Sequence, residues 1–583
     1  MRDRVHRILN GFLGVLAVFA VVSLVVEYGF DLTPEVAHWL HRVDTGILVG
    51  FVVQALIRVL VTTDRWTYIR QHRGEAVVAL LIFIYLAFPG LLERGIQVWA
   101  PNVAPGALAR IYIVASQVLV LATAGVASVR ASHRLLHMNI QPSLLLVLSF
   151  LFLILTGTGL LMLPRSTVAG GMHWIDALFT ATSAVCVTGL IVVDTATYFT
   201  PLGQAVLLVL IQLGGLGIMT FTSFFALIGG APRGLREYTT LRSLLGEESL
   251  ARIRSTVVAI VLVTFVCEVL GAVALYHFWP EHTASGQGPR WWMAVFHAVS
   301  AFCNAGFALL SDNFADAGLA RCAPVLWISM GLVIVGGIGF PVIRDLTTWV
   351  WARRARRYPY PRLSLHTRLV LLMTLILIVV GAIGLYLLEG TRAFAHFGNP
   401  YAPLAALFHS VSARTAGFNT VDIRTLGPAA SFLLIGLMWI GASPGSTGGG
   451  VKTTTVAVAV MNMYALAQGQ ERVELFHRQI APIVVVRAFA TVILSFFFIA
   501  GMLFLLLITE NADFLDLLFE LVSAVSTVGL SRGITPDLSP LGKLLTTVAM
   551  FFGRVGLLTI VMTLIPARPV RRIDYPQETV LVG

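Results

Sequence analysis

Charged residues are scarce in this chain. Of its 583 residues, 12% are charged and 57% are hydrophobic, whereas ordinary globular domains carry about 25% charged residues. With a mean hydropathy of +0.85, the chain has more apolar side chain than one water-facing fold can bury, which excludes a soluble protein. The net charge of +11 does not indicate nucleic-acid binding, because the basic residues lie in short stretches between apolar runs, where they orient membrane helices.

Cysteine and lysine are also rare. The four cysteines form no CxxC pair and no disulfide framework, so the sequence predicts no metal site, and we interpret them as small packing residues. They are Cys186, Cys267, Cys303 and Cys322. The apolar run that ends near Val26 is longer than a signal-peptide core and lacks a clear cleavage site, so we interpret it as a retained helix.

The N-terminal region, residues 1–138, is predicted to hold four membrane helices. The apolar runs lie near residues 8–26, 44–61, 76–92 and 107–127. This order is similar to the sensor half of voltage-gated channels, but a sensor needs arginines at every third residue of its fourth helix. Here Arg110 begins that run and the next charge is Arg130, which favours a structural or docking module.

The rest of the chain repeats itself four times. Residues 179–190, 296–307, 408–418 and 519–530 are alike, and the glycines within them lie 117, 111 and 112 residues apart. A long apolar span precedes each segment and another follows it, so the repeating unit is long helix, short helix, glycine strand, long helix. The predicted boundaries are 139–240, 241–358, 359–475 and 476–567, followed by a cytoplasmic tail, 568–583.

The short helix of each repeat cannot cross a membrane. Twelve helical residues, as in 176–187, reach about 18 Å, against a hydrocarbon core of about 30 Å. Such a segment is tolerated at depth only where it lines a watery cavity or is buried in protein. The sequence therefore predicts four reentrant loops around one pseudo-fourfold axis, in an all-α polytopic membrane protein.

The distribution of basic residues predicts the orientation. The links that follow the second helices (231–256, 344–368, 468–487 and 568–572) hold 18 Arg in 76 residues. The stretches between first and second helices (164–200, 280–323, 389–428 and 509–543) hold eight Arg plus Lys in 156 residues. By the positive-inside rule the first set is cytoplasmic, so the reentrant loops enter from outside.

Four converging glycine strands predict a cation filter. Rings of backbone carbonyls can replace the hydration shell of K⁺, and glycine reaches the required backbone conformations at low cost. The short helices would point their partially negative C-termini at the axis, which favours cations. The predicted ion-binding residues carry no carboxylate: Val187, Thr188, Gly189, Asn304, Ala305, Gly306, Thr415, Ala416, Gly417, Thr527, Val528 and Gly529.

The second helix of the third repeat is predicted to be broken. Residues 440–455 place five glycines and a proline in mid-span, which a continuous helix does not tolerate. A loop at this depth should line the conduit. The predicted gate residues are Gly445, Ser446, Thr447, Gly448, Gly449, Gly450, Lys452 and Arg554. Similarity to a nucleotide P-loop fails, because Val451 separates the last glycine from Lys452.

Arg554 lies in an apolar stretch, 548–564, of the last span. An arginine at this depth needs a partner, and we expect it to bond the loop carbonyls and to raise a barrier below the filter; snorkelling is the alternative. For Lys452, anchoring of a helix end and gating are both open. Glycine pairs recur in two of the other second helices, at Gly214–Gly217 and Gly336–Gly339, where close packing or a hinge near the pore is expected.

These motifs resemble the Trk/Ktr/HKT superfamily of potassium transporters over about residues 143–565. The resemblance implies one filter glycine per repeat, at Gly189, Gly306, Gly417 and Gly529. Serine at the first of these positions is associated with sodium preference, so Gly189 points to potassium. The resemblance also implies an intramembrane gating loop, a pore arginine on the last helix, a homodimer and a ring of cytosolic nucleotide-binding subunits. The N-terminal helices depart from the family's minimal pattern.

The expected function is potassium uptake across the plasma membrane, with K⁺ as the transported ion. No covalent cofactor is expected, and nucleotide acts only through a regulatory partner. The alternative is a sodium-permeable or ion-coupled secondary transporter. A coupled transporter usually requires carboxylates within the membrane, and Glu268 and Glu520 are the best candidates. An enzyme is not expected, because the spans hold no nucleophile–base set.

Overall fold

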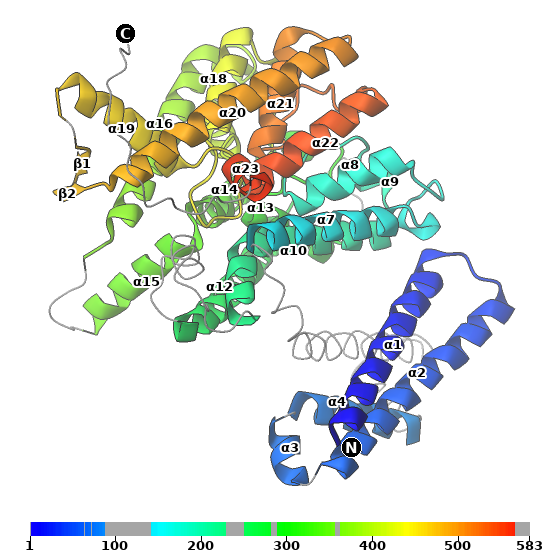
Figure 1. The fold of residues 1–583 in the computed structure, drawn as a ribbon. Helices are drawn as coiled ribbons and strands as arrows, with labels where there is room; N and C mark the ends of the chain where they lie inside the picture. Colours follow the sequence, from blue (N-terminus) through cyan, green and yellow to red (C-terminus); the bar gives the residue numbers. More distant parts are fainter. Residues whose placement is uncertain are drawn as a thin grey trace.

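A computed structural model describes residues 2–62, 64–71, 73–87, 142–228, 250–280, 288–316, 318–355, 362–470 and 472–565. The described chain is almost entirely helical, with one short hairpin of strands β1 (Glu474–Leu475) and β2 (Arg478–Gln479) (Figure 1). The predicted fourth N-terminal helix, 107–127, and the tail, 568–583, lie outside the described residues.

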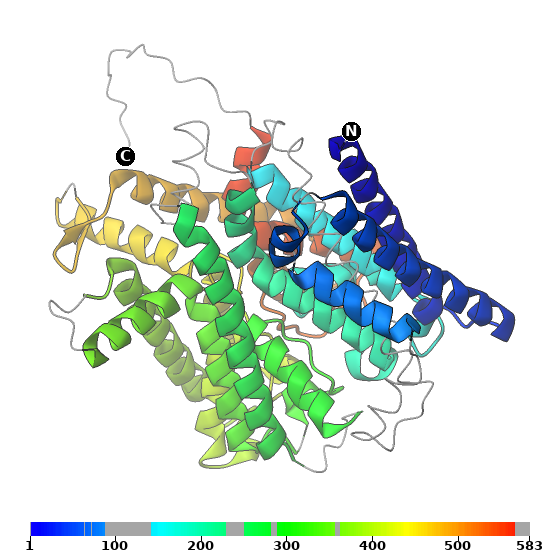
Figure 2. The same cartoon turned by 90° about the horizontal axis from the view of Figure 1, so that it is seen from below.

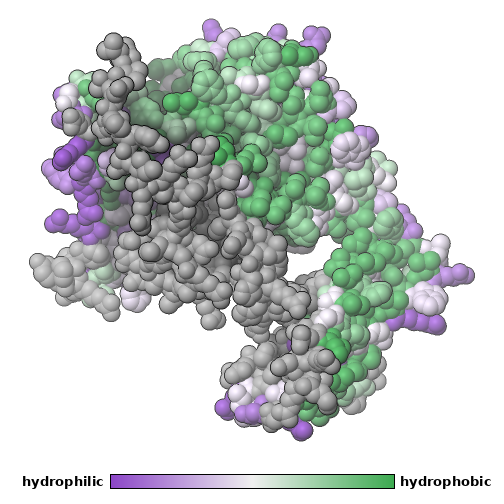
Figure 3. Space-filling view, viewed as in Figure 1, coloured by the Kyte–Doolittle hydropathy of each residue, from purple (hydrophilic) through white to green (hydrophobic). Residues whose placement is uncertain are grey.

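Six of the described helices are long and apolar enough to cross a membrane, or eight if each of two bent pairs counts as one span. Their outward faces carry large apolar side chains in open contact with the surroundings; Phe152, Leu387 and Phe497 are 69%, 76% and 68% exposed. Apolar residues cover much of the described surface (Figure 3). Such a surface is suited to lipid, which confirms the predicted class of helical polytopic membrane protein.

The chain from Pro142 onward forms four units of first helix, short helix and second helix. Their bounds are α7 (Pro142–Leu161), α8 (Trp174–Val185) and α10 (Pro201–Ile228); α12 (Leu250–Phe278), α13 (Arg290–Cys303) and α14 (Ala323–Ile338); α16 (Leu365–Glu389), α17 (Tyr401–Ser412) and α18 (Pro428–Trp439); α20 (Pro482–Thr509), α21 (Phe514–Ser526) and α22 (Pro540–Val555). The short helices have 12 to 14 residues, too few to cross a bilayer.

The four units close into a ring. The second helix of each repeat packs on the short helix of the next: α10 on α13, α14 on α17, α18 on α21, and α22 back on α8. Figures 1 and 2 show the first unit, drawn in cyan, beside the last, drawn in red. Because the fourth repeat returns to the first, the short helices surround one central region.

Three second helices are interrupted, where the sequence suggested one. The third repeat is broken between α18 and α19 (Thr453–Ala467), as predicted. In addition, α14 meets α15 (Phe340–Arg354) at 98°, and α22 meets α23 (Leu557–Leu564) at 91°. The first bend falls at Gly339, in the glycine run for which close packing or a hinge was expected, whereas no break was expected at Gly556. Gly339 and Gly556 adopt φ of 88° and 93°, which glycine reaches without the steric penalty of a Cβ.

The N-terminal helices form a separate bundle beside the repeats. It consists of α1 (Arg2–Gly29), α2 (Pro34–Val61), α3 (Arg65–Gln71) and α4 (Arg73–Ala87). The turn between α1 and α2 contacts the first repeat just after α7, where Arg165 donates to the Glu27 carbonyl at 3.2 Å and lies 3.6 Å from Asp31. A short 3-10 helix, η2 (Pro164–Ser166), carries this arginine.

Candidate ion pathway

Just after each short helix, the residue two positions before the glycine of the repeat adopts a left-handed conformation. Val187, Asn304, Thr415 and Thr527 have φ of 55°, 59°, 69° and 52°. The glycines Gly189, Gly306, Gly417 and Gly529 follow at 89°, 70°, 77° and 95°. Positive φ at alternate positions is uncommon for residues with a Cβ, and its recurrence in all four repeats means that the four strands share one backbone shape.

The four glycines meet at the centre of the ring. A Cβ on Gly189 would lie 2.4 Å from the Ala305 carbonyl oxygen, and one on Gly306 would lie 2.9 Å from that of Ala416. The same contact recurs from Gly417 to Val528, at 2.5 Å, and from Gly529 to Thr188, at 2.2 Å. The order of contacts follows the repeats around the ring and closes on itself, so only glycine allows the strands to approach this closely.

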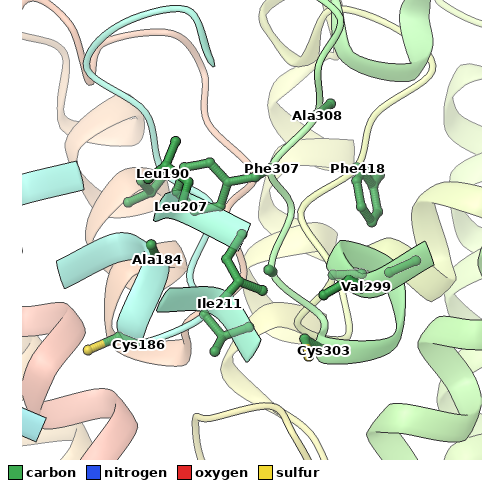
Figure 4. Close-up of a cluster of buried hydrophobic side chains, with 14 of the residues drawn as sticks. Ala184, Cys186, Leu190, Leu207, Ile211, Val299, Cys303, Phe307, Ala308 and Phe418 are labelled. Atoms are coloured by element: carbon green, nitrogen blue, oxygen red, sulfur yellow. The ribbon is translucent and has the colours of Figure 1, made fainter. Parts of the chain in front are cut away.

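The structure therefore brings the predicted ion-binding residues together. They offer backbone carbonyl groups rather than side-chain carboxylates. All twelve lie on these four strands, and none carries a carboxylate. The strands are held from behind by the residue after each glycine, because Leu190, Phe307, Phe418 and Leu530 are all buried. In Figure 4, Phe307 of the second repeat lies beside Leu190 and Leu207 of the first.

A serine on each short helix braces its strand, a role that the sequence analysis missed. Ser183 and Ser523 accept from the backbone N–H of Gly189 and Gly529 at 3.1 and 3.0 Å. In the other repeats Ser300 donates to the Phe307 carbonyl at 2.7 Å, and Ser412 to that of Phe418 at 2.5 Å. The signal was present, since serine occupies the same place in all four similar segments.

In three repeats, a glycine of the second helix allows that helix to pack closely against the short helix of the same repeat. A Cβ on Gly214, Gly336 or Gly553 would lie 2.0, 2.0 or 1.9 Å from the carbonyl oxygen of Val185, Phe302 or Val525. These carbonyls belong to the last turns of the short helices. The close approach agrees with the packing role expected of the glycine pairs and adds Gly553 to them.

The broken segment between α18 and α19 lies against the inner ends of the glycine strands. Gly449 N–H donates to Thr527 Oγ1 at 2.9 Å, and Thr447 Oγ1 lies 3.3 Å from Asn304 Oδ1. A Cβ on Gly448 would lie 2.1 Å from Thr415 Oγ1. The loop thus touches the first strand residue of three repeats. Of the other predicted gate residues, Ser446 is buried and donates to the Ser443 carbonyl at 2.6 Å.

The ends of this loop are held by backbone contacts. Gly445 accepts from Phe340 N–H at 3.0 Å, next to the bend after α14. Gly450 has φ of 70° and lies near Gly441, where the two ends of the loop pair. The loop is therefore anchored both to itself and to the second repeat.

Arg554 spans the loop and the first repeat. It is 2% exposed, and its guanidinium donates to the Thr447 carbonyl and, at 2.6 Å, to the Gly214 carbonyl. The expected contact between this arginine and a loop carbonyl is present, whereas the contact with α10 was not foreseen. A guanidinium suits this role because its donors point in fixed directions and it stays charged.

Lys452 also bonds the loop. Its ammonium donates to the Gly448 and Gly449 carbonyls at 2.7 and 3.3 Å, while its backbone caps the start of α19. Lys452 therefore lies at the start of a helix and also bonds the loop, the two locations that the sequence left open. Together with Arg554 it places two positive charges on the loop that lies below the strands.

The two acidic candidates lie beside the four glycine strands rather than on them. Glu520 on α21 accepts from Ser531 at 2.8 Å and from Thr535, behind the fourth strand. Glu268 on α12 accepts from Gln212 at 3.1 Å. Both side chains are buried and hydrogen-bonded. Among the described residues, no group of three or more His, Cys, Asp or Glu could hold a metal ion.

Comparison with known proteins identifies the class of molecule to which this fold and ring belong. The model of the TrkH family, described as a cation transport protein, matches residues 111–572. The chain belongs to this family, as its resemblance predicted. It is therefore related to transport proteins rather than to enzymes.

Individual relatives support the same assignment. The chain is 40% identical to the Ktr system potassium uptake protein B of Vibrio alginolyticus, over 76% of this chain and 95% of that protein. It is 35% identical to the potassium/sodium uptake protein NtpJ of Enterococcus hirae, over 76% and 98%. The crystal structure of the potassium transporter TrkH from Vibrio parahaemolyticus has the same fold, with a TM-score of 0.61, 18% identity, and coverage of 84% and 97%.

Proposed function

We propose that this chain is the pore-forming membrane subunit of a potassium uptake system. K⁺ would pass between the four glycine strands, where carbonyl oxygens replace its water of hydration. The observation that carries the proposal is the closed ring of glycine contacts, because four strands of one shape around one axis are what such a filter requires. The relatives named as potassium uptake proteins support the choice of ion.

The carbonyl filter is tested by adding one methyl group at the ring. In proteoliposomes with an inward potassium gradient and no valinomycin, the full-length protein should take up K⁺. Gly417→Ala should abolish uptake, because its Cβ would lie 2.5 Å from the Val528 carbonyl oxygen. Gly436→Ala in α18 is the matched control, since a Cβ there meets nothing within 4 Å. Equal uptake by the two variants would refute the filter.

The same vesicles separate the alternative functions. Passive K⁺ flux along the electrochemical gradient supports a channel-like pathway, whereas uphill movement tied to a second ion supports a coupled carrier. Glu268 and Glu520 are the residues on which such coupling would rest. Equal Na⁺ and K⁺ flux would support a sodium-permeable protein. The similarity to a potassium/sodium uptake protein is the observation that favours this alternative.

The segment from Gly445 to Gly450 is proposed as the gate. It contacts the inner ends of three strands and is bonded by two cationic side chains, so a cation leaving the filter would meet both a steric and an electrostatic barrier. Opening requires that the Arg554 and Lys452 contacts to this loop be broken or moved. In this proposal, the loop with both contacts made is the closed state of the gate.

Regulation is proposed to come from outside this chain. A homodimer in the plasma membrane, with the filter entrance outside, would dock a cytosolic ring of nucleotide-binding subunits on its arginine-rich links. The relatives' names refer to a Ktr system, which supports the existence of further components. Purification from the native membrane, followed by identification of the accompanying soluble subunit, tests this; recovery of the chain alone at full activity would refute it.

A further inference from the structure

One arginine near the inner end of a glycine strand has no part in the ion pathway described above. Arg414 follows α17 and directly precedes Thr415, and its side chain is 6% exposed. The equivalent residues of the other repeats, each three positions before the glycine, are uncharged: Cys186, Cys303 and Ser526. The third repeat therefore buries a positive charge that the other repeats lack at this place.

Little in the described part of the chain compensates this charge. The guanidinium donates one long hydrogen bond, from Nη1 to the Thr374 carbonyl at 3.4 Å, and Nε is buried without an acceptor. No carboxylate of the described residues forms an ion pair with Arg414. Arg554 and Lys452 differ, because each donates to two backbone carbonyls. Since arginine stays protonated in proteins, a buried Arg414 needs a partner of opposite charge.

Arg414 lies at a small cavity between three helices. The cavity is bounded by α14, α16 and the end of α17, and its volume is about 10 Å³, which is room for one water-sized particle. Six of its eight lining residues are apolar. The two polar ones are Arg414 and Thr374, and the Thr374 hydroxyl is also buried without a hydrogen-bond partner. The cavity thus combines a buried positive charge, a buried hydroxyl and apolar walls.

We propose that this cavity binds one small monovalent anion, such as chloride, as the counter-charge of Arg414. The guanidinium supplies the charge and an N–H donor, and the Thr374 hydroxyl supplies a second donor. A halide ion is only slightly larger than a water molecule, whereas a carboxylate- or phosphate-bearing metabolite is too large for this cavity. A single water molecule would bond both groups but would leave the charge uncompensated.

The anion would keep the inner end of the third strand electrically neutral. Arg414 is the residue next to Thr415, which the gate loop contacts at Gly448, so the counter-charge lies close to the proposed conduit. The site is defined by binding and does not depend on the proposed transport of K⁺.

The direct test is a crystal structure of the full-length protein in bromide, whose anomalous scattering locates the ion. A bromide peak in contact with Arg414 and Thr374 is expected. Arg414→Met, which keeps a long side chain without the charge, should show no peak there. Arg165→Gln, which changes an arginine outside this cavity, is the matched control and should keep the peak. A cavity that holds only water in crystals of the unmodified protein in bromide would overturn the proposal.

A solution measurement separates a specific site from binding at crystal concentration only. At constant ionic strength, with gluconate as the anion that is too large to enter, bromide should raise the melting temperature. The rise should be about 1–3 °C for each tenfold increase above the Kd. Thr374→Val keeps the shape of the side chain but loses the hydroxyl, and should need a roughly tenfold higher bromide concentration for the same rise.

The response of Arg414→Met decides between a site and a general salt effect. Its melting temperature should not respond to bromide and, in gluconate, should be no lower than that of the unmodified protein, because an uncompensated buried charge has been removed. An equal response of this variant and the unmodified protein would overturn the proposal. If Arg414→Met does not fold, an unchanged bromide dependence of Thr374→Val would overturn it instead. Absence of K⁺ uptake in vesicles would refute the proposed function and would leave this site standing.

Discussion

Replacement of Arg554 by glutamine gives the sharpest test of the proposed gate. The change removes a buried charge and at least one of the two hydrogen bonds that join α22 to the Thr447 and Gly214 carbonyls. A hydrogen bond to a charged group contributes about 1.5–3 kcal/mol. Since 1.4 kcal/mol corresponds to a tenfold change in an equilibrium constant, loss of the loop contact should favour loop opening by about 10- to 100-fold.

The assay is uptake of rubidium-86 by proteoliposomes that contain the full-length chain without a regulatory partner. We expect the initial rate of Arg554→Gln to rise by roughly tenfold or more, provided that the unmodified loop is mostly closed. Arg554→Lys separates the two contributions: it keeps the positive charge but loses the fixed fork of donors. A lysine variant that behaves like the unmodified protein assigns the barrier to charge, and one that behaves like the glutamine variant assigns it to the hydrogen bonds.

The control is Arg165→Gln, which removes an arginine that contacts the N-terminal bundle and is 49% exposed. Its uptake rate should match that of the unmodified protein. If Arg554→Gln is folded and its rate is unchanged, the arginine does not hold the loop, and the gate proposal is wrong.

Three further changes test the filter and its support. Gly189→Ser should lower the K⁺/Na⁺ uptake ratio, because its Cβ would lie 2.4 Å from the Ala305 carbonyl oxygen; Gly159→Ser, where a Cβ meets nothing within 4 Å, should leave the ratio unchanged. Ser523→Ala removes the acceptor of the Gly529 N–H and should destabilise the native conformation of the fourth strand by about 1–3 kcal/mol. The expected result is a lower K⁺/Na⁺ uptake ratio with an unchanged melting temperature. Gly553→Ala should lower the melting temperature by several degrees, because its Cβ would lie 1.9 Å from a backbone oxygen; an unchanged temperature in detergent would contradict the packing described here.

Much of the architecture follows from local patterns in the sequence. The apolar spans that precede the four similar segments, near 143–163, 255–279, 368–388 and 483–508, coincide with the first helices Pro142–Leu161, Leu250–Phe278, Leu365–Glu389 and Pro482–Thr509. Apolar length alone predicts such spans, because a bilayer sets how many residues cross it. The break in the third second helix was equally visible, since glycine and proline are concentrated there.

The bend after α22 was not predicted, and at the glycine run before the bend after α14 close packing and a hinge were both left open. Each depends on one glycine, Gly339 or Gly556, in an otherwise apolar helix, and single glycines in membrane helices commonly serve packing instead. Tertiary contacts decide between these roles: Gly339 faces the Pro444 carbonyl of the loop, where a Cβ would lie 2.5 Å from the oxygen. A position of this kind cannot be recognised without knowing what lies opposite.

The sequence by itself determined that the protein spans a membrane, that four similar units follow an N-terminal helical region, and that each unit brings one glycine to the end of a short helix. These properties depend on composition, apolar length and spacing, which are local. The tertiary structure alone decided which strand touches which, that Arg554 joins carbonyls 107 and 340 residues away, and that Arg414 and Thr374 line one cavity. Such pairings depend on how the four units close into a ring, and no local propensity specifies that closure.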